Sequence, residues 1–235
     1  MSDWKMKRFW KEARVSETAD GYAVLLDGRG VKTPAKHSLV LPTRPMAEAI
    51  AAEWDAQEAE VNPLSMPSTR TANAAIDKVS VQHAEVADML ADYGDSDLLC
   101  YRADYPEGLV ERQSDKWDPM LDWAAEALDA RLEIRSGVIH QPQSPDTLSR
   151  LRDRTHALSF FELAAFHDLV SLSGSLILGF ATSMGKNSPE DIWELSRLDE
   201  HWQAEQWGKD DEAEAMAAVK RGEFLHAARM FTLCR

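Results

Sequence analysis

Tryptophan and acidic residues lie close together near the end of the sequence, in a spacing that suits recognition of another protein. Helical periodicity predicts one helix over residues 188–207. On this helix Trp193, Glu200 and Trp207 share a face, which also holds Arg197. A carboxylate between two indoles loses part of its hydration, so it needs an arginine partner, either in this chain or in another.

Two interpretations of this helix are open. In the first, the tryptophans belong to the core and Glu200 pairs with Arg197. In the second, the helix presents a partner-binding face, since aromatic anchors around a few oriented charges are common in interface hot spots. A neighbouring stripe carries Asp199 and Trp202. The candidate partner-binding residues are Trp193, Arg197, Asp199, Glu200, Trp202 and Trp207.

No catalytic motif stands out. A Gly-x-Ser-x-Gly nucleophile turn is absent, and residues 173–175 (Ser-Gly-Ser) lie inside a helical pattern, where we expect close packing. Cys100 has apolar neighbours, which predicts a buried and unreactive thiol. The alternative to a binding protein is a small-molecule enzyme that uses paired carboxylates, such as Asp97 and Asp199, as general acid and base. Only the abundance of acidic residues supports it.

Metal and phosphate sites are not predicted either, so we expect no cofactor. The histidines form no pair four residues apart on a helix and no His-Glu-x-x-His motif. Residues 27–30 (Asp-Gly-Arg-Gly) join two strand patterns, so they predict a hairpin turn and lack the helix N-terminus that binds phosphate. The histidines are His37, His83, His140, His156, His167, His201 and His226.

The charge distribution excludes several classes of partner. The net charge is −14, and residues 61–235 hold 30 acidic against 17 basic side chains. Nucleic acid and anionic membranes need a basic surface, so neither is expected as a partner. A short basic cluster over residues 5–11 predicts a solvated arm. The only two cysteines, Cys100 and Cys234, favour a reducing compartment.

The longest stretch without charge, residues 169–185, reaches only the lower length limit of a membrane span. Serine, threonine and glycine dilute its apolar character. We therefore predict the central buried helix of a bundle and no membrane insertion.

The first part of the chain has the pattern of a small α+β domain. Short apolar runs separated by turn residues between 13 and 41 predict a small antiparallel sheet. After Pro42 the period changes to that of a helix, with Thr43 as its cap and Met46, Ile50 and Trp54 as its apolar stripe. We expect this helix to cover one face of the sheet.

Prolines at 63 and 67 then interrupt the chain, which predicts an N-terminal α+β domain over residues 1–65 and a helical bundle domain over 66–235. Asp118 and Ser188 each precede a proline and are predicted to cap helices. A segment over 132–139 has extended character. The predicted helices cover residues 69–93, 107–115, 118–130, 145–158, 160–183, 188–207 and 210–233.

Motifs along most of the chain resemble the chaperone family that assembles the catalytic head of F-type ATP synthase, in the branch that binds the α subunit. Each motif alone is weak, and their order and spacing carry the resemblance. They are Leu26-Asp27-Gly28-Arg29, Glu53-Trp54-Asp55-Ala56-Gln57, Asn73-Ala74-Ala75-Ile76-Asp77, Asp97-Leu98-Leu99-Cys100-Tyr101-Arg102, Trp117-Asp118-Pro119-Met120-Leu121-Asp122-Trp123, Arg197-Leu198-Asp199-Glu200 and Trp207-Gly208.

The resemblance implies an assembly factor without enzymatic activity that shields the free α subunit until the β subunit replaces it. It implies a small α+β unit followed by an orthogonal helical bundle, and it places the family's acidic motif on Asp199 and Glu200. Since no long presequence precedes Arg8, we expect a cytoplasmic bacterial member of the family.

Overall fold

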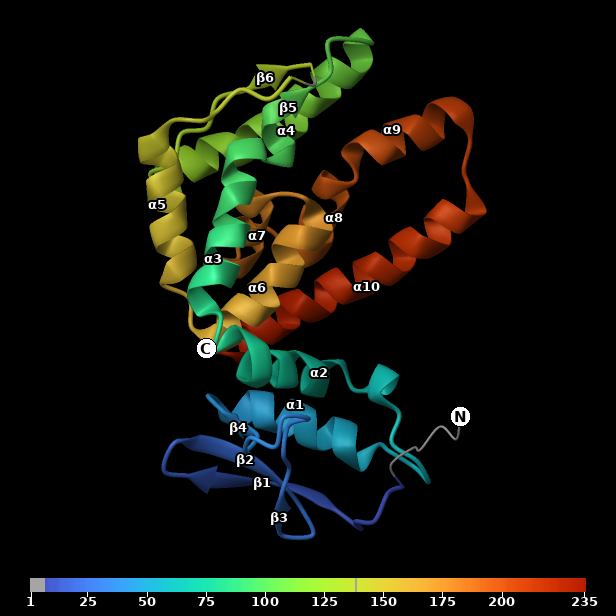
Figure 1. Cartoon of the computed structure of the whole chain (residues 1–235). Helices are drawn as coiled ribbons and strands as arrows, with labels where there is room; N and C mark the ends of the chain where they lie inside the picture. Colours follow the sequence, from blue (N-terminus) through green and yellow to red (C-terminus); the bar gives the residue numbers. More distant parts are fainter. Residues whose placement is uncertain (1–6, 138) are drawn as a thin grey trace. The chain divides into compact units, whose positions relative to one another are not determined.

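The structure is a computed structural model that describes residues 7–137 and 139–235 (Figure 1). It contains two compact units. Unit 1 holds residues 7–82 together with 160–165 and 229–235, and unit 2 holds the rest of the described chain from 83 to 228. The predicted division into domains at residue 65 concerns independent folding and stays a prediction. In the structure, residues 66–82 belong to the same compact unit as the N-terminal residues.

Unit 1 is built on a small antiparallel sheet, as predicted (Figure 1). Strands β1 (Ala13–Thr18) and β2 (Gly21–Leu26) pair along their full length, and β2 also pairs with β3 (Arg29–Gly30) and β4 (Val40–Leu41). Gly21 has a φ of 141°, and a Cβ there would lie 2.3 Å from the Leu41 carbonyl oxygen. Only glycine fits this position. The predicted hairpin turn is confirmed at Asp27 and Gly28, which both have positive φ.

Helix α1 (Arg44–Asp55) contacts β1 and β2 and begins as predicted. The Thr43 side chain accepts a hydrogen bond from the Met46 amide at 3.3 Å, and Met46, Ile50 and Trp54 are buried. The prediction of a solvated basic arm is only partly correct. Arg8 donates to the carbonyls of Asp55 and Gln57, so it is bound to the fold instead of solvated. Lys5, also in that arm, lies outside the described residues.

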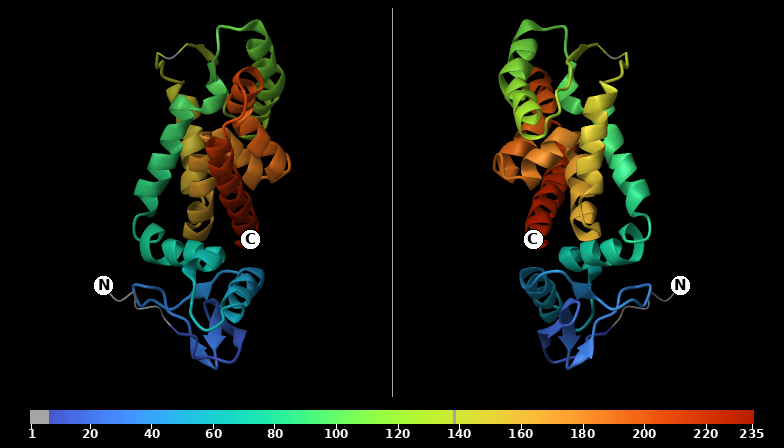
Figure 2. Two further views of the ribbon diagram at one scale, coloured as in Figure 1. Left: turned by 90° about the vertical axis from the view of Figure 1, so that its right-hand side faces the viewer. Right: turned by 90° about the vertical axis from the view of Figure 1, so that its left-hand side faces the viewer.

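Unit 2 consists mainly of helices, and the α+β fold class is confirmed (Figure 2). No helix among residues 7–137 and 139–235 is long and apolar enough to cross a membrane. A two-stranded parallel ladder joins β5 (Tyr101–Arg102) to β6 (Arg135–Ser136). Only β6 lies within the segment predicted to be extended, and β5 was not predicted. The helices after α1 are α2 (Pro67–Ala74), α3 (His83–Ala91), α4 (Glu107–Ala127), α5 (Pro145–His156), α6 (Phe160–Ser173), α7 (Leu176–Ser183), α8 (Pro189–Ser196), α9 (Leu198–Trp207) and α10 (Asp211–Leu233). Short 3₁₀ helices lie at Pro63–Ser65, Asp92–Ser96 and Leu98–Cys100, and a π-helical segment lies at Ala75–Val79.

Several predicted helix boundaries after residue 66 are wrong. The cap at Asp118 does not exist, because α4 continues through Pro119. Pro119 lies on the exposed side, where solvent can satisfy the carbonyl that its missing N–H leaves free. The Asp118 carboxylate instead accepts a hydrogen bond from Arg102 at 2.8 Å. The predicted helix over 69–93 continues from α2 into the π-helical segment and is then interrupted by a turn at residues 80–82, before α3.

Most of the charge-free stretch is buried, but it is not one helix. Gly174 has a φ of 71° and separates α6 from α7, so residues 173–175 end a helix instead of packing within one. The Ser175 hydroxyl then caps α7 by accepting from the Leu178 amide at 3.0 Å. Close packing occurs at Gly179, where a Cβ would lie 2.7 Å from Val170.

A buried carboxylate fixes the start of α7. Asp97 is fully buried and accepts hydrogen bonds from the Ser175 hydroxyl at 2.7 Å, the Ile177 amide at 3.1 Å and the Leu99 amide at 3.0 Å. These bonds favour the ionised form, but burial outweighs them and raises the pKa of Asp97 to about 6. Cys100 is buried as predicted, and this burial raises the pKa of its thiol, which disfavours the reactive thiolate.

We predict that Asp97→Ala lowers the free energy of unfolding by about 3–5 kcal/mol, because it leaves buried donors without acceptors. Chemical denaturation measures this. Asp122→Ala on the exposed side of α4 is the control, with a change within about 0.5 kcal/mol. Equal effects of the two substitutions would contradict the role of Asp97.

The raised pKa of Asp97 also predicts a pH dependence. Folded Asp97 keeps its proton up to about pH 6, whereas unfolded aspartate releases it near about pH 4. The contribution of Asp97 to the free energy of unfolding should therefore fall as pH rises between these values. The native chain and Asp97→Asn are compared by denaturation across this range. A difference between them that stays constant or grows with pH would contradict the raised pKa.

Candidate functional site

The helix predicted over 188–207 is two helices, α8 and α9, with a break at Arg197. In a continuous helix the Arg197 amide would donate to the Trp193 carbonyl. Here the Ser196 hydroxyl donates to that carbonyl at 2.7 Å, and the Arg197 amide donates to Glu194 instead. Side-chain competition for a backbone acceptor thus ends α8. The predicted start is confirmed, since Ser188 accepts from the Asp191 amide at 3.1 Å.

The break separates residues that were predicted to share one face. Trp193 is buried, with its ring 5.6 Å from the ring of Phe224, so the interpretation as a core residue holds for it. The guanidinium of Arg197 lies 5.8 Å from the Trp193 ring and pairs with the Glu200 carboxylate at 2.6 Å. Glu200 remains exposed. Within this chain Glu200 therefore pairs with Arg197, the residue directly before α9.

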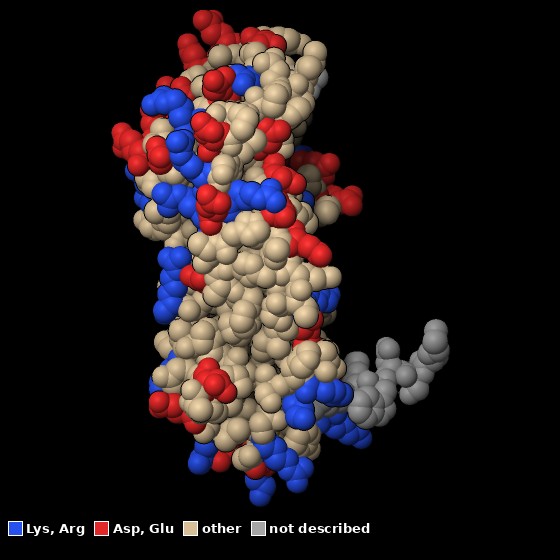
Figure 3. Space-filling model, turned by 60° about the vertical axis from the view of Figure 1, so that its left-hand side comes forward, with Lys and Arg blue, Asp and Glu red and all other residues tan. Residues whose placement is uncertain are grey.

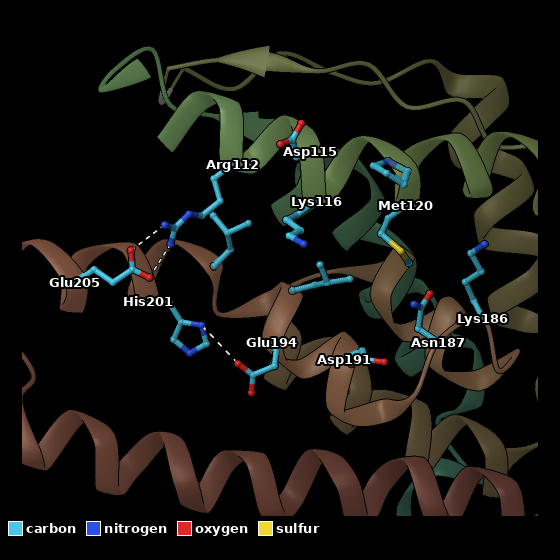
Figure 4. A pocket seen from close by; sticks show the side chains of 13 residues that line it. Arg112, Asp115, Lys116, Met120, Lys186, Asn187, Asp191, Glu194, His201 and Glu205 are labelled. Carbon is cyan, nitrogen blue, oxygen red and sulfur yellow. Dashed lines mark hydrogen bonds and ion pairs between the residues drawn. The ribbon is translucent and has the colours of Figure 1, made fainter. Parts of the chain in front are cut away.

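Helix α9 is attached to α4 mainly by side-chain polar contacts. Gln113 is buried, donates to Asp199 at 2.7 Å and accepts from the Ala103 amide at 2.9 Å. Arg112 donates two hydrogen bonds of 2.8 Å to the Glu205 carboxylate, a bidentate pair that lowers the pKa of Glu205 (Figure 4). These contacts fix the side of α9 that faces α4.

An indole completes this attachment. The Trp202 ring lies 4.8 Å from the Arg112 guanidinium and covers Gly108, where a Cβ would come within 2.9 Å of the ring. Because Gly108 has no side chain, the outer tip of the Trp202 ring can approach the backbone at the start of α4.

A groove on one side of α9 brings together three of the predicted residues. Asp199, Trp202 and Trp207 all line it, and Trp207 has 79% of its surface exposed. Tyr105, on the opposite wall, is 83% exposed. The volume is about 700 Å³. We call it the aromatic groove, and its lining includes Tyr101, Tyr105, Leu109, Asp199, Trp202 and Trp207.

A second groove, on the other side of α9, has charges of both signs (Figure 4). Its volume is about 730 Å³, and α4, α8 and α9 form its walls. His201 lies 3.6 Å from Glu194 across it, and Lys116 and Lys186 point into it from other elements (Figure 4). The predicted residues Trp193, Arg197 and Glu200 line neither groove.

Paired charges characterise another part of the surface. Figure 3 shows a face on which acidic and basic side chains lie intermixed. Ion pairs of α5 are of this kind, with Arg150 3.1 Å from Asp129 and Arg152 2.6 Å from Asp88. The charges of such exposed pairs already neutralise each other, so they contribute little to binding another protein.

The two carboxylates considered for acid–base catalysis do not meet in either groove. Asp199 lines the aromatic groove, whereas Asp97 is fully buried and lines neither. Histidine, cysteine and acidic side chains form no cluster that could hold a metal ion within residues 7–137 and 139–235. Neither observation favours the enzymatic alternative.

Sequence reasoning missed the residues on α4 that position the groove. Leu109, Gln113 and Trp117 follow a four-residue spacing, and the last two are buried. A glutamine between apolar positions of one stripe is a detectable signal, because a buried amide needs polar partners. Arg112 and Gly108 gave no comparable signal.

Known proteins resemble this chain in sequence and in structure. The family model described as ATP12 chaperone protein matches residues 7–125. The chain belongs to the ATP12 chaperone family. It is 28% identical over 219 residues to the mitochondrial Protein atp12 of Schizosaccharomyces pombe, covering 88% of this chain and 75% of that protein. The resemblance to ATP synthase assembly chaperones is confirmed, and the client of such a chaperone is a protein.

Two solved structures share the fold. Atp12 from Paracoccus denitrificans is 49% identical, with a TM-score of 0.96 over 99% of this chain and 100% of that one. The Atu1473 protein from Agrobacterium tumefaciens is 40% identical, with a TM-score of 0.92 over 97% of this chain and 86% of that one. Similarity at this level extends through both compact units.

We predict that Gln113→Leu lowers the free energy of unfolding by about 1–3 kcal/mol, since the Ala103 amide and Asp199 lose a buried partner. Denaturation measures the loss, and tryptophan fluorescence reports a changed environment of the groove indoles. The control is Glu111→Leu, two residues away and on the exposed side of α4. No loss of stability with Gln113→Leu would contradict the positioning role.

Proposed function

We propose that this chain binds the free α subunit of the F-type ATP synthase catalytic head and shields its interface until the β subunit replaces it. The client makes its contact at the aromatic groove and at the adjoining exposed face of α9. Family membership supports an assembly role in ATP synthase, and the proposal adds the identity of the client and the surface that binds it.

One observation carries the choice of surface. The aromatic groove exposes two large aromatic side chains, Trp207 and Tyr105, beside the carboxylate of Asp199. Exposed aromatic groups around an oriented charge form strong anchors in protein interfaces. A subunit that awaits its neighbours exposes apolar surface that would otherwise aggregate. A groove of this kind can cover part of such a surface and release it again.

The net charge of the chain suits this role. A charge of −14 keeps a complex with an aggregation-prone client in solution. It also attracts basic groups on the client, which accelerates association more than it tightens the final complex. Reversible binding is needed, because the chaperone must leave when the β subunit arrives.

We also propose a cytoplasmic location in a bacterium. Both cysteines are free, which is consistent with a reducing compartment. The solved relative from Paracoccus denitrificans supports the bacterial part of the proposal.

We predict that the chain and isolated α subunit elute as one complex from a size-exclusion column, and that Trp207→Ala weakens the complex about tenfold. The side chain is exposed, so its removal should leave the fold intact. Leu64→Ala, at a residue 79% exposed in unit 1, is the matched control. Failure of the native chain to bind at low and moderate salt would reject the proposed client.

Glu200→Lys is predicted to weaken binding of the α subunit without unfolding the chain, because the substitution reverses an exposed charge beside Arg197. Circular dichroism checks the fold and a binding titration measures affinity. Glu126→Lys makes the same charge change at an exposed position on α4, outside both grooves. If both variants bind like the native chain, the face of α9 has been chosen wrongly.

A further inference from the structure

The apolar stripe of α10 continues beyond the part of the helix that the chain itself covers. Phe224, Ala227 and Ala228 are buried and follow the three- and four-residue spacing of one helix face. The same spacing, continued toward the N-terminus, selects Lys220, Ala217, Met216 and Ala213. Residues 211–220 are all exposed except Ala217, which is half-buried. We call Ala213, Met216, Ala217 and Lys220 the α10 patch.

The α10 patch lies on a well-formed helix. Asp210 caps it, accepting from the amides of Glu212 at 2.9 Å and Ala213 at 3.2 Å. Lys209 pairs with Glu214 at 2.7 Å across the same turn. Figure 1 shows this half of α10 leading to the connection with α9. The exposed side chains are therefore presented on a fixed surface.

The patch continues, along α10, the helix face that contacts one of the predicted binding residues. Phe224, the first fully buried residue of the stripe, contacts the ring of Trp193, which lies beneath Arg197 and its partner Glu200. Met216 is 57% exposed, and Val219, three residues further on, is 63% exposed. Small alanine side chains let another backbone approach closely, and methionine adapts to different shapes. Apart from the exposed Lys220, the α10 patch is apolar, and it is accessible and close to α9 in the chain.

The charges around the patch indicate the chemistry of its occupant. The first turn of α10 carries Asp211, Glu212 and Glu214. The side chains of Asp211 and Glu212 form no ion pair with the described part of the chain. A complementary partner therefore combines apolar side chains with lysine or arginine. A second copy of this chain fits less well, because each copy carries a net charge of −14.

We propose that the α10 patch is a second docking surface, which binds an apolar segment of the client flanked by lysine or arginine. The inference rests on the proposed function, because the client supplies this segment. Two surfaces joined by the connection between α9 and α10 would hold the client more firmly than the aromatic groove alone, since the second contact forms within an existing complex.

A matched pair of substitutions tests the α10 patch. Ala217→Glu places a charge on the patch, and Ala215→Glu makes the same change about 160° around the helix, at an exposed position. Affinity for isolated α subunit is measured by titration. We expect Ala217→Glu to weaken binding about tenfold and Ala215→Glu to change it less than about twofold. Equal effects of the two substitutions, whether both weak or both strong, would overturn the inference.

Three further measurements secure the result. Met216→Ser removes apolar surface at an exposed position, so it should weaken binding without lowering the melting temperature. Hydrogen exchange of residues 213–221 should slow when the client is added, and unchanged exchange would overturn the inference. Size-exclusion of the chain alone should show no association through Met216, since self-association there would assign the patch to a second copy.

A native chain that binds no α subunit rejects the proposed function itself, whereas a native complex insensitive to Ala217→Glu rejects only the second surface.

Discussion

The position of α9 depends on side chains of α4 that bind it from one side. Leu198 is the only residue of α9 that is buried, so apolar burial contributes little to its attachment. The hydrogen bond from Gln113 to Asp199, the bidentate pair of Arg112 with Glu205 and the contact of Trp202 with Gly108 replace it. Polar contacts of this kind fix orientation as well as position. They leave the opposite face of α9 and Trp207 free for another molecule.

Carboxylates set the directions of several elements in the same way. Asp97 accepts from the amides that begin α7 and the turn before β5, and Glu53 accepts from the amides of Ser68 and Thr69 at the start of α2. Each carboxylate satisfies donors that a helix N-terminus leaves unpaired and interacts favourably with the helix dipole. Part of the acidic composition is therefore structural, and the rest remains on the surface, where it can act on a client.

The sequence predicted the elements whose signals are local and missed those decided by competition between side chains and backbone. The sheet and α1 follow from turn residues, a cap at Thr43 and an apolar stripe, and all of these are confirmed. The start of α7 and the end of α8 depend on where the hydroxyls of Ser175 and Ser196 form hydrogen bonds, and hydrophobic periodicity carries no information about this. Pro119 misled the prediction in the opposite direction, because its local signal indicated a helix end that does not exist. A helix tolerates proline where the carbonyl four residues earlier, which loses its donor, faces water.

The same distinction explains the candidate site. Assigning Trp193, Glu200 and Trp207 to one face assumed a continuous helix, so the break at Arg197 moved Trp193 into the core. Trp202 and Asp199 were predicted from a neighbouring stripe of the same helix, and the groove that unites them with Trp207 is completed by α4 and the segment before it. That contact joins residues far apart in the sequence. Helix periodicity within one segment could not predict it.

The central claim is that this chain covers a surface of the α subunit that the β subunit later occupies. The most direct test adds purified β subunit to a preformed complex of the chain with α and follows the masses of all species by mass photometry. The account predicts that free chain appears in step with an α–β assembly. A stable assembly that contains all three proteins, or a chain that stays bound to α at saturating β, would contradict it.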